Sequence, residues 1–404
     1  METTLEFPRG IEAALPFPAG EQLRKRAFWT TMACFLVHGL VVSTWVSRIA
    51  SVKATLGLSD GALGLALLGT AIGSVTAIPI CGGIVARHGS RRTAQWTAAG
   101  FCLSLVAIAF AADGRTLFAA LLLYGAMAGA NDVAMNAHAV ATEKLLGTPT
   151  ISRFHSMFSI GGIAGASLGA AIAGHGVAPR AHLIGATALI LLFTMTATRR
   201  LVETRNGAAH AARASFRRIP RALIALSAIG FCIFLSEGAI ADWTAVYLKQ
   251  ILGAGEGLAP VGYAVFSAAM AIFRLAGDAI TLRVGRARVI RYGGSLAAAG
   301  LTFALLVPSP YWALVGFAAA GAGFSSIIPL VFAAGGRIQD ISEGAGVATV
   351  SGLGYMGFLV GPPAIGMISE LTSLRAGLFL LVGLSIAAAS LVRVVTRGEA
   401  NPLQ

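Results

Sequence analysis

The sequence predicts an all-α membrane protein, with twelve transmembrane helices in two pseudo-symmetric six-helix halves. The prediction rests on an apolar, charge-poor composition, on about a dozen apolar stretches of spanning length, and on motifs that recur at one fixed offset. Of the 404 residues, 56% are hydrophobic and 12% are charged, whereas soluble domains carry about 25% charged residues. This composition argues against an ordinary soluble enzyme, because the chain lacks the charge to cover a compact particle.

The apolar stretches define the expected organisation, because a spanning helix needs about 20 mostly apolar residues. The expected spans are 28–48, 60–80, 92–112, 115–141, 153–174, 180–198, 222–248, 258–277, 289–307, 311–333, 345–369 and 375–395. They group into an N-terminal tail 1–27, a first half 28–198, a basic linker 199–221, a second half 222–395 and a C-terminal tail 396–404.

The basic residues predict the orientation. With both termini in the cytoplasm, 24 of the 30 Lys and Arg residues fall on the cytoplasmic side and 6 on the other, as the positive-inside rule requires. The net charge of +13 is thereby explained without nucleic acid as a partner. We therefore expect a multi-pass protein of a bacterial inner membrane, with both termini in the cytoplasm and the lipid bilayer as its surroundings.

Two motifs recur 196 residues apart. Gly82, Arg87, Gly89 and Arg92 correspond to Asp278, Arg283, Gly285 and Arg288, and the pair Gly161 and Gly165 corresponds to Gly357 and Gly361. One offset that serves two separate motifs indicates two related halves in the same orientation. Halves related by an axis along the membrane normal suit alternating access, with a substrate site between them.

The segment from Gly82 to Arg92, GGIVARHGSRR, resembles the loop signature between spans 2 and 3 of the major facilitator superfamily, G-x-x-x-D-R-x-G-R-R, with Ala86 in place of Asp. The segments 129–136, 153–162 and 237–243 resemble its fucose-permease-like branch, which includes the rhizopine (amino-inositol) transport proteins of rhizobia. This resemblance implies proton-coupled movement of a sugar-like solute. The acidic residue of fucose permease in span 1 has no counterpart here, where His38 is the group that titrates near neutrality.

Ionisable groups inside the spans are the candidates for proton coupling, because a charge at the bilayer centre costs at least about 2.5 kcal/mol. Asp132 and Glu237 are the leading candidates, with His38 as a helper. Asn136 shares a helix face with Asp132, and a structural polar pair is the alternative reading. Asp242 lies five residues after Glu237, rotated by roughly 140°.

Two further sets of residues complete the candidate site. Two interpretations fit Trp243 and Tyr247 equally well: stacking on the apolar face of a sugar or cyclitol, and anchoring at the membrane interface. Arg274 and Asp278 are interpreted as an intracellular gate pair. The substrate-binding candidates are Asn131, Asn136, Asp242, Trp243, Tyr247 and Tyr355, and the gating candidates are Arg48, Arg87, Arg91, His155, Arg274 and Asp278.

The sequence leaves three functions open. The first is a proton symporter for a small hydrophilic sugar-like or cyclitol solute, and the second is a proton-coupled exporter of drugs or metabolites. The exporter is weakly disfavoured, because Ala166 replaces the proline of the G-x-x-x-G-P signature in span 5. The third is a membrane receptor. The sequence has no phosphate-binding loop and no His/Cys metal spacing, so we expect neither enzyme activity nor a cofactor. The resemblance implies a monomer.

Overall fold

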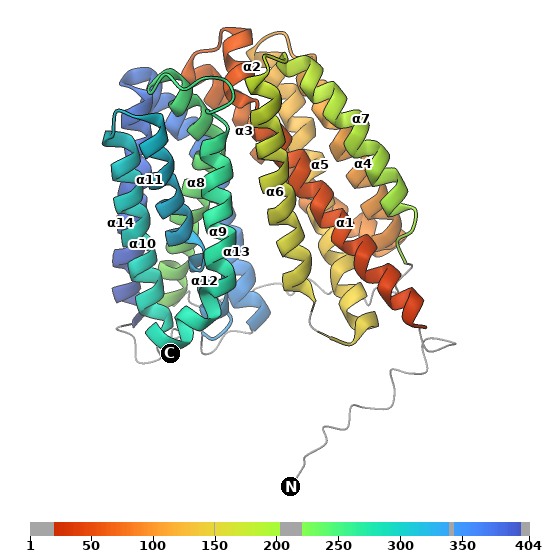
Figure 1. The fold of residues 1–404 in the computed structure, drawn as a ribbon. Helices are drawn as coiled ribbons and strands as arrows, with labels where there is room; N and C mark the ends of the chain where they lie inside the picture. The colour runs from red at the N-terminus through yellow and green to blue at the C-terminus, as the bar shows by residue number, and fades with distance from the viewer. Residues whose placement is uncertain (1–19, 149, 203–219, 339–342, 397–404) are drawn as a thin grey trace.

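The computed structural model describes residues 20–148, 150–202, 220–338 and 343–396, and the described part of the chain is folded into fourteen helices (Figure 1). These are α1 (Glu21–Val46), α2 (Ile49–Leu56), α3 (Asp60–His88), α4 (Ser90–Ala109), α5 (Gly114–Leu146), α6 (Ile151–Gly174), α7 (Pro179–Thr198), α8 (Arg221–Gln250), α9 (Val261–Val284), α10 (Arg286–Leu306), α11 (Pro310–Phe324), α12 (Ile327–Gly335), α13 (Glu343–Leu371) and α14 (Leu374–Thr396).

The helices coincide with the twelve expected spans, which confirms the predicted fold class. One span is broken in the structure where a single helix was expected: the tenth, 311–333, divides into α11 and α12 at Ser325 and Ser326. The first expected span, 28–48, ends close to the end of α1, and the short helix α2 follows it as an element that the sequence did not predict. By length and apolarity alone, ten helical segments of the described residues qualify as spans. The two expected spans outside this set are those of α4 and α9.

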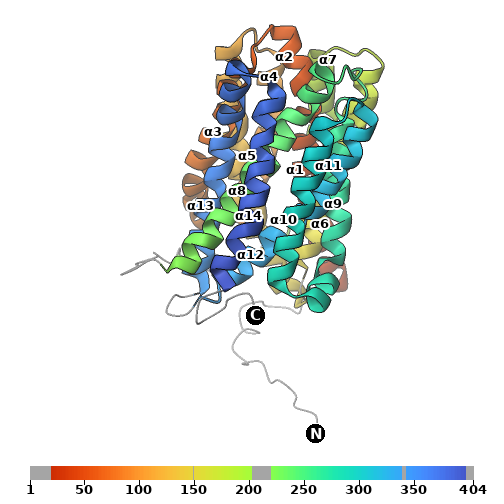
Figure 2. The same ribbon diagram turned by 90° about the vertical axis from the view of Figure 1, so that its left-hand side faces the viewer.

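Helices α1 to α7 form one bundle and α8 to α14 form a second (Figure 1). In the first bundle α1 packs on α6 and α3 on α5, and in the second α8 packs on α13 and α10 on both α11 and α14. The bundles meet where α3 packs against α13, α6 against α9 and α2 against α8 (Figure 2). The bounds proposed for the two halves stay a prediction, and most of the linker 199–221 lies outside the described residues.

The two bundles repeat each other's local structure. Gly89 joins α3 to α4 with φ 82°, and Gly285 joins α9 to α10 with φ 89°. Both turns use a backbone conformation that glycine adopts without strain. A Cβ on Gly161 would lie 2.3 Å from the Leu36 carbonyl oxygen, and a Cβ on Gly357 would lie 2.5 Å from that of Phe231. The repeated glycines therefore make equivalent close contacts, α6 to α1 in one bundle and α13 to α8 in the other.

The bundles are joined most tightly at the end that carries α2, here called the α2 end; the opposite end, where α1 begins and α14 stops, is the α12 end (Figure 1). At the α2 end, a Cβ on Gly64 of α3 would lie 2.7 Å from the Pro362 carbonyl oxygen of α13. A Cβ on Gly257, after α8, would lie 2.9 Å from the Gly174 Cα of α6. Toward the α12 end the ribbons of the two bundles diverge (Figure 1).

Candidate functional site

The first group of predicted residues lies inside the N-terminal bundle. The Asn131 amide of α5 is 2.9 Å from Nδ1 of His38 on α1, and Asn131 Oδ1 accepts a hydrogen bond from Thr97 of α4. The His38 ring packs against Phe101 and Phe158, with centroids 4.9 Å and 5.7 Å away. Asn131 and His38 are therefore buried together and tie three helices of one bundle.

The next residue, Asp132, points elsewhere and is only partly buried. Its Oδ1 accepts a hydrogen bond of 3.0 Å from Asn136 Nδ2, one turn further along α5, which confirms that the two side chains share a face. Asp132 is also close enough to interact electrostatically with Tyr355 of α13, in the other bundle. The Asp132 carboxylate thus faces the boundary between the two bundles.

Glu237 of α8 approaches the same tyrosine from the C-terminal bundle. Its Oε1 is buried and has no hydrogen-bond partner among the residues that the structure describes. A buried carboxylate oxygen without a partner is costly and calls for a ligand, a water molecule or a proton. Two carboxylates from different bundles therefore interact electrostatically with Tyr355, which is 45% exposed.

An aromatic cluster supports Tyr355. Its ring stacks on Phe234 of α8 with centroids 4.9 Å apart and an interplanar angle of 19°, and it lies 6.1 Å from the Phe358 ring. Phe358 also packs over Gly238, next to Glu237. The cluster fixes the tyrosine beside the carboxylate and presents an apolar surface there.

Asp242 forms a second level, about 7.5 Å further along α8 toward the α2 end. It interacts electrostatically with Tyr124 of α5 and with Tyr263 of α9. Tyr263 also interacts with Glu237, although the two carboxylates leave α8 in different directions. Tyr263 thus connects the two levels of polar groups.

Trp243 and Tyr247, two predicted substrate ligands, lie outside this group. Both are completely buried, and the Tyr247 hydroxyl donates to the carbonyl oxygens of Ala304 and Leu305 in α10. The Tyr247 ring packs against Phe317 of α11. These contacts are internal to the C-terminal bundle, whereas the buried Trp243 Nε1 has no hydrogen-bond partner among the described residues. The substrate contacts expected of Trp243 and Tyr247 stay predictions, and the site proposed below does not use them.

Of the predicted gating residues, Arg48 lies at the α2 end, where its Nε donates to His182 Nδ1 at 2.8 Å. Its other contacts include the Val177 carbonyl oxygen, in the same bundle. Arg87 is exposed near the α3–α4 turn, and Arg91 interacts with His138 of α5. Arg48 also interacts electrostatically with Glu256, in the loop after α8, so it reaches across to the other bundle.

The other gating residues lie where the bundles diverge. His155 of α6 packs edge-on against Phe35 of α1 and interacts electrostatically with Arg274 of α9, across the boundary between bundles. Arg274 Nε donates to the Ser325 carbonyl oxygen at 2.9 Å. The side chain of Asp278, its predicted partner, lies outside the described part of the structure.

Polar contacts close the α2 end. Asp60 of α3 pairs with Lys53 of α2 at 2.7 Å and accepts a hydrogen bond from Ser369 of α13. The Gly61 N–H donates to Glu370 Oε2 at 2.9 Å. Both contacts with α13 cross between the bundles, next to the close glycine approach.

A second closing contact centres on Glu256, in the loop after α8. Its carboxylate accepts hydrogen bonds from Ser51 of α2, at 2.7 Å, and from Lys249. Partial burial raises the pKa of Glu256, but these two hydrogen bonds and the charges of Lys249 and Arg48 outweigh it and hold the pKa below its ordinary value of 4.5. Because this pKa is depressed, the contact is fully formed at neutral pH and is lost as the pH falls through the lowered value.

Glu256→Gln is therefore expected to loosen the α2 end at neutral pH, since the amide loses the charge that holds Lys249. The readout is the thiol-labelling rate of an Ala173→Cys variant, whose side chain is buried beside this contact. Labelling should accelerate several-fold, and in the parent protein it should accelerate only on acidification below about pH 4.5. Glu21→Gln, which removes an exposed pair with Lys25, is the control; equal labelling in both variants would refute the role of Glu256.

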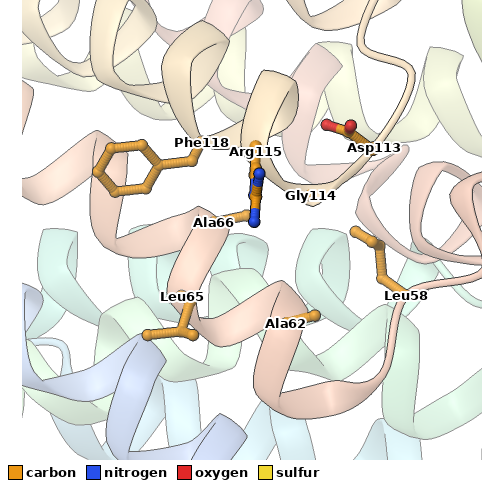
Figure 3. Close-up of a pocket in the computed structure, with 8 residues that line it drawn as sticks. All are labelled: Leu58, Ala62, Leu65, Ala66, Asp113, Gly114, Arg115 and Phe118. Carbon is orange, nitrogen blue, oxygen red and sulfur yellow. The ribbon is translucent and has the colours of Figure 1, made fainter.

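Neither of the two described pockets contains the paired carboxylates. The larger, of about 570 Å³, lies at the α2 end between α3 and the start of α5, and its lining includes the charged side chains of Asp113 and Arg115 (Figure 3). The smaller, of about 350 Å³, lies beside Arg48 and Glu256. The candidate site is accordingly defined by the electrostatic interactions of carboxylates and tyrosines from both bundles and by the aromatic cluster around Tyr355.

Sequence reasoning missed Tyr124, Tyr263, Phe234 and Phe358. The tyrosines carried a usable signal. The chain has 6 tyrosines, and Tyr124 and Tyr263 lie within predicted spans, although tyrosine in membrane proteins is enriched at the interface. The phenylalanines carried none, because an apolar ring in a span resembles any lipid-facing or core residue.

The comparisons with known proteins agree with this architecture. The sequence pattern of the Major Facilitator Superfamily matches residues 27–340. An uncharacterized MFS-type transporter of Yersinia pestis is 34% identical over 369 residues, which cover 91% of this chain and 95% of the relative. Membrane protein MosC of Rhizobium meliloti is 34% identical over 360 residues, which cover 88% and 87%. A crystal structure of a mutant of the nucleoside transporter NupG has the same fold, with a TM-score of 0.73, 16% identity and coverage of 91% and 99%.

Proposed function

Since the chain belongs to the Major Facilitator Superfamily, a family of membrane transporters and not of enzymes, we propose that it is a secondary active transporter of a small hydrophilic sugar-like or cyclitol solute, an amino-inositol included. Transport is by proton symport and alternating access. The protein works as a monomer in a bacterial inner membrane, with both termini in the cytoplasm.

The observation that carries the proposal is that Asp132 and Glu237 both interact electrostatically with Tyr355. The carboxylates come from different bundles, and both lie within membrane-spanning helices. Ionisable groups there are expensive and usually serve a transport pathway or a proton relay. A group shared by both bundles can respond to their relative movement, which is what coupling a proton to alternating access requires.

The surrounding side chains suit a polyol. Carboxylates, the Asn136 amide and tyrosine hydroxyls can exchange hydrogen bonds with ring hydroxyls, and the stacked rings of Tyr355 and Phe234 offer a surface for the apolar face of the ring. An amino group on the solute would pair with Asp132 or Glu237. The orientation predicted by the basic residues places the α2 end on the side of the membrane opposite the cytoplasm. The contacts that close this end therefore support an inward-facing conformation.

Ligand-induced stabilisation of the purified protein in detergent tests the proposal, because a ligand of the folded state raises the apparent melting temperature by mass action. The panel comprises hexoses, deoxy-sugars, inositols, amino-inositols and lipophilic cations, at pH 5.5 and 7.5. We expect a sugar or cyclitol to stabilise the protein, and Glu237→Gln to abolish the pH dependence. Stabilisation by lipophilic cations alone would overturn the symporter in favour of an exporter.

A further inference from the structure

The break between α11 and α12 leaves one backbone acceptor without its helical donor. In an α-helix the carbonyl of residue i accepts from the N–H of residue i+4. The residue four positions after Ser325 is Pro329, which has no N–H. Ser325 is only 3% exposed, and within a membrane a backbone group without a partner is costly.

Arg274 of α9 supplies the missing donor, since its Nε lies 2.9 Å from the Ser325 carbonyl oxygen. One turn further along α9, a Cβ on Gly277 would lie 2.5 Å from Ser326 Oγ. The glycine therefore lets α9 press directly against the break. A side-chain guanidinium replaces a helical hydrogen bond at the point where the tenth span changes direction.

The same guanidinium interacts with the candidate site. Arg274 is close enough to interact electrostatically with Glu237 of α8 and with His155 of α6 in the other bundle. Both are titratable groups on helices that pack against α9. Because a guanidinium has five N–H donors in a planar fork, it can hold the Ser325 carbonyl through Nε while its terminal nitrogens respond to Glu237.

We propose that Arg274 is a positioning residue that links the charge on Glu237 to the geometry of the α11–α12 break. An ionised Glu237 holds the guanidinium in place and keeps the Ser325 carbonyl paired. Protonation of Glu237, or its engagement by a solute, releases the guanidinium, so that the unpaired break lets α12 change its direction at the α12 end. This role rests on the proposed function of Glu237 in proton coupling.

The hydrogen bond itself is tested by a double-mutant cycle that does not depend on transport. Arg274→Ala should lower the melting temperature of the detergent-purified protein, by an amount on the order of 2 °C. Pro329→Ala restores an N–H for the Ser325 carbonyl, so in that background Arg274→Ala should cause less than half of this loss. An equal loss in both backgrounds would overturn the assignment. If the Arg274→Ala variant does not fold, the same hydrogen bond is tested by the yield of folded protein, which adding Pro329→Ala should restore.

The link to Glu237 is tested by the thiol-labelling rate of an Ala333→Cys variant, on an exposed position of α12. Glu237→Gln should change this rate several-fold in the parent protein and leave it unchanged in the Arg274→Ala, Pro329→Ala background. The same change in both backgrounds would show that the charge on Glu237 reaches α12 without Arg274. If Arg274→Ala and Pro329→Ala prove independent while proton-driven transport is intact, only the role of Arg274 is refuted. If the two substitutions are coupled as expected but no solute is transported, only the proposed function is refuted.

Discussion

Asp132→Asn is expected to abolish proton-driven accumulation while leaving solute binding and exchange in place. An amide of the same shape keeps the contact with Asn136, so the helix and the site retain their form, but it cannot carry a proton. A gradient of one pH unit supports about tenfold accumulation for each coupled proton. The variant should reach only passive equilibrium across proteoliposome membranes, where the parent protein concentrates the solute.

The control for this prediction is Asp113→Asn, at the start of the same helix. Asp113 caps α5 through the Thr116 N–H and lies outside the site, and asparagine is an equally good cap. Accumulation should therefore persist in this variant. Normal accumulation by Asp132→Asn under a pH gradient would remove Asp132 as the coupling group and leave Glu237 as the remaining candidate.

Gly64→Leu is expected to stop transport by preventing closure of the α2 end. Even a Cβ at this position would lie 2.7 Å from the Pro362 carbonyl oxygen and 3.0 Å from the Gly366 Cα, so a leucine side chain cannot fit between α3 and α13. Overpacking of this kind costs about 1–3 kcal/mol, which is enough to shift the balance between two conformations. We expect transport to fall by at least about tenfold, with solute binding preserved.

The measurement for Gly64→Leu is solute transport together with the thiol-labelling rate of the Ala173→Cys variant from the α2 end, which should rise as transport falls. Gly383→Leu is the matched control, because a Cβ at Gly383 meets no described atom within 4 Å. If Gly64→Leu transports at the parent rate, the close approach of α3 and α13 at Gly64 is not required for transport.

The sequence predicted the spans well, because burial in a bilayer imposes length and apolarity on each helix separately. It also predicted the repeat, because the turns at Gly89 and Gly285 both need a positive φ, which favours glycine at the same position in each half. It did not predict the division of the tenth span. Pro329 was visible in the sequence, but the residue that pairs with the freed carbonyl, Arg274, lies on another helix.

The candidate site was predictable only in part, for a related reason. An intramembrane carboxylate such as Asp132 or Glu237 stands out in an apolar sequence whatever surrounds it. The neighbours of each carboxylate depend on which face its helix turns toward the other bundle. Tyr247 looked as suitable for a substrate as Tyr355, yet it is buried against α10, whereas Tyr355 is 45% exposed and interacts electrostatically with both carboxylates.

Proton symport is tested most directly by measuring the proton movement that accompanies solute entry. The protein is reconstituted into proteoliposomes in weakly buffered medium without a pre-formed gradient, and the sugar or cyclitol that stabilises it best is added outside. The account predicts alkalinisation of the medium as protons enter with the solute, and no alkalinisation for Asp132→Asn. Solute entry without proton movement, or acidification of the medium, would contradict it.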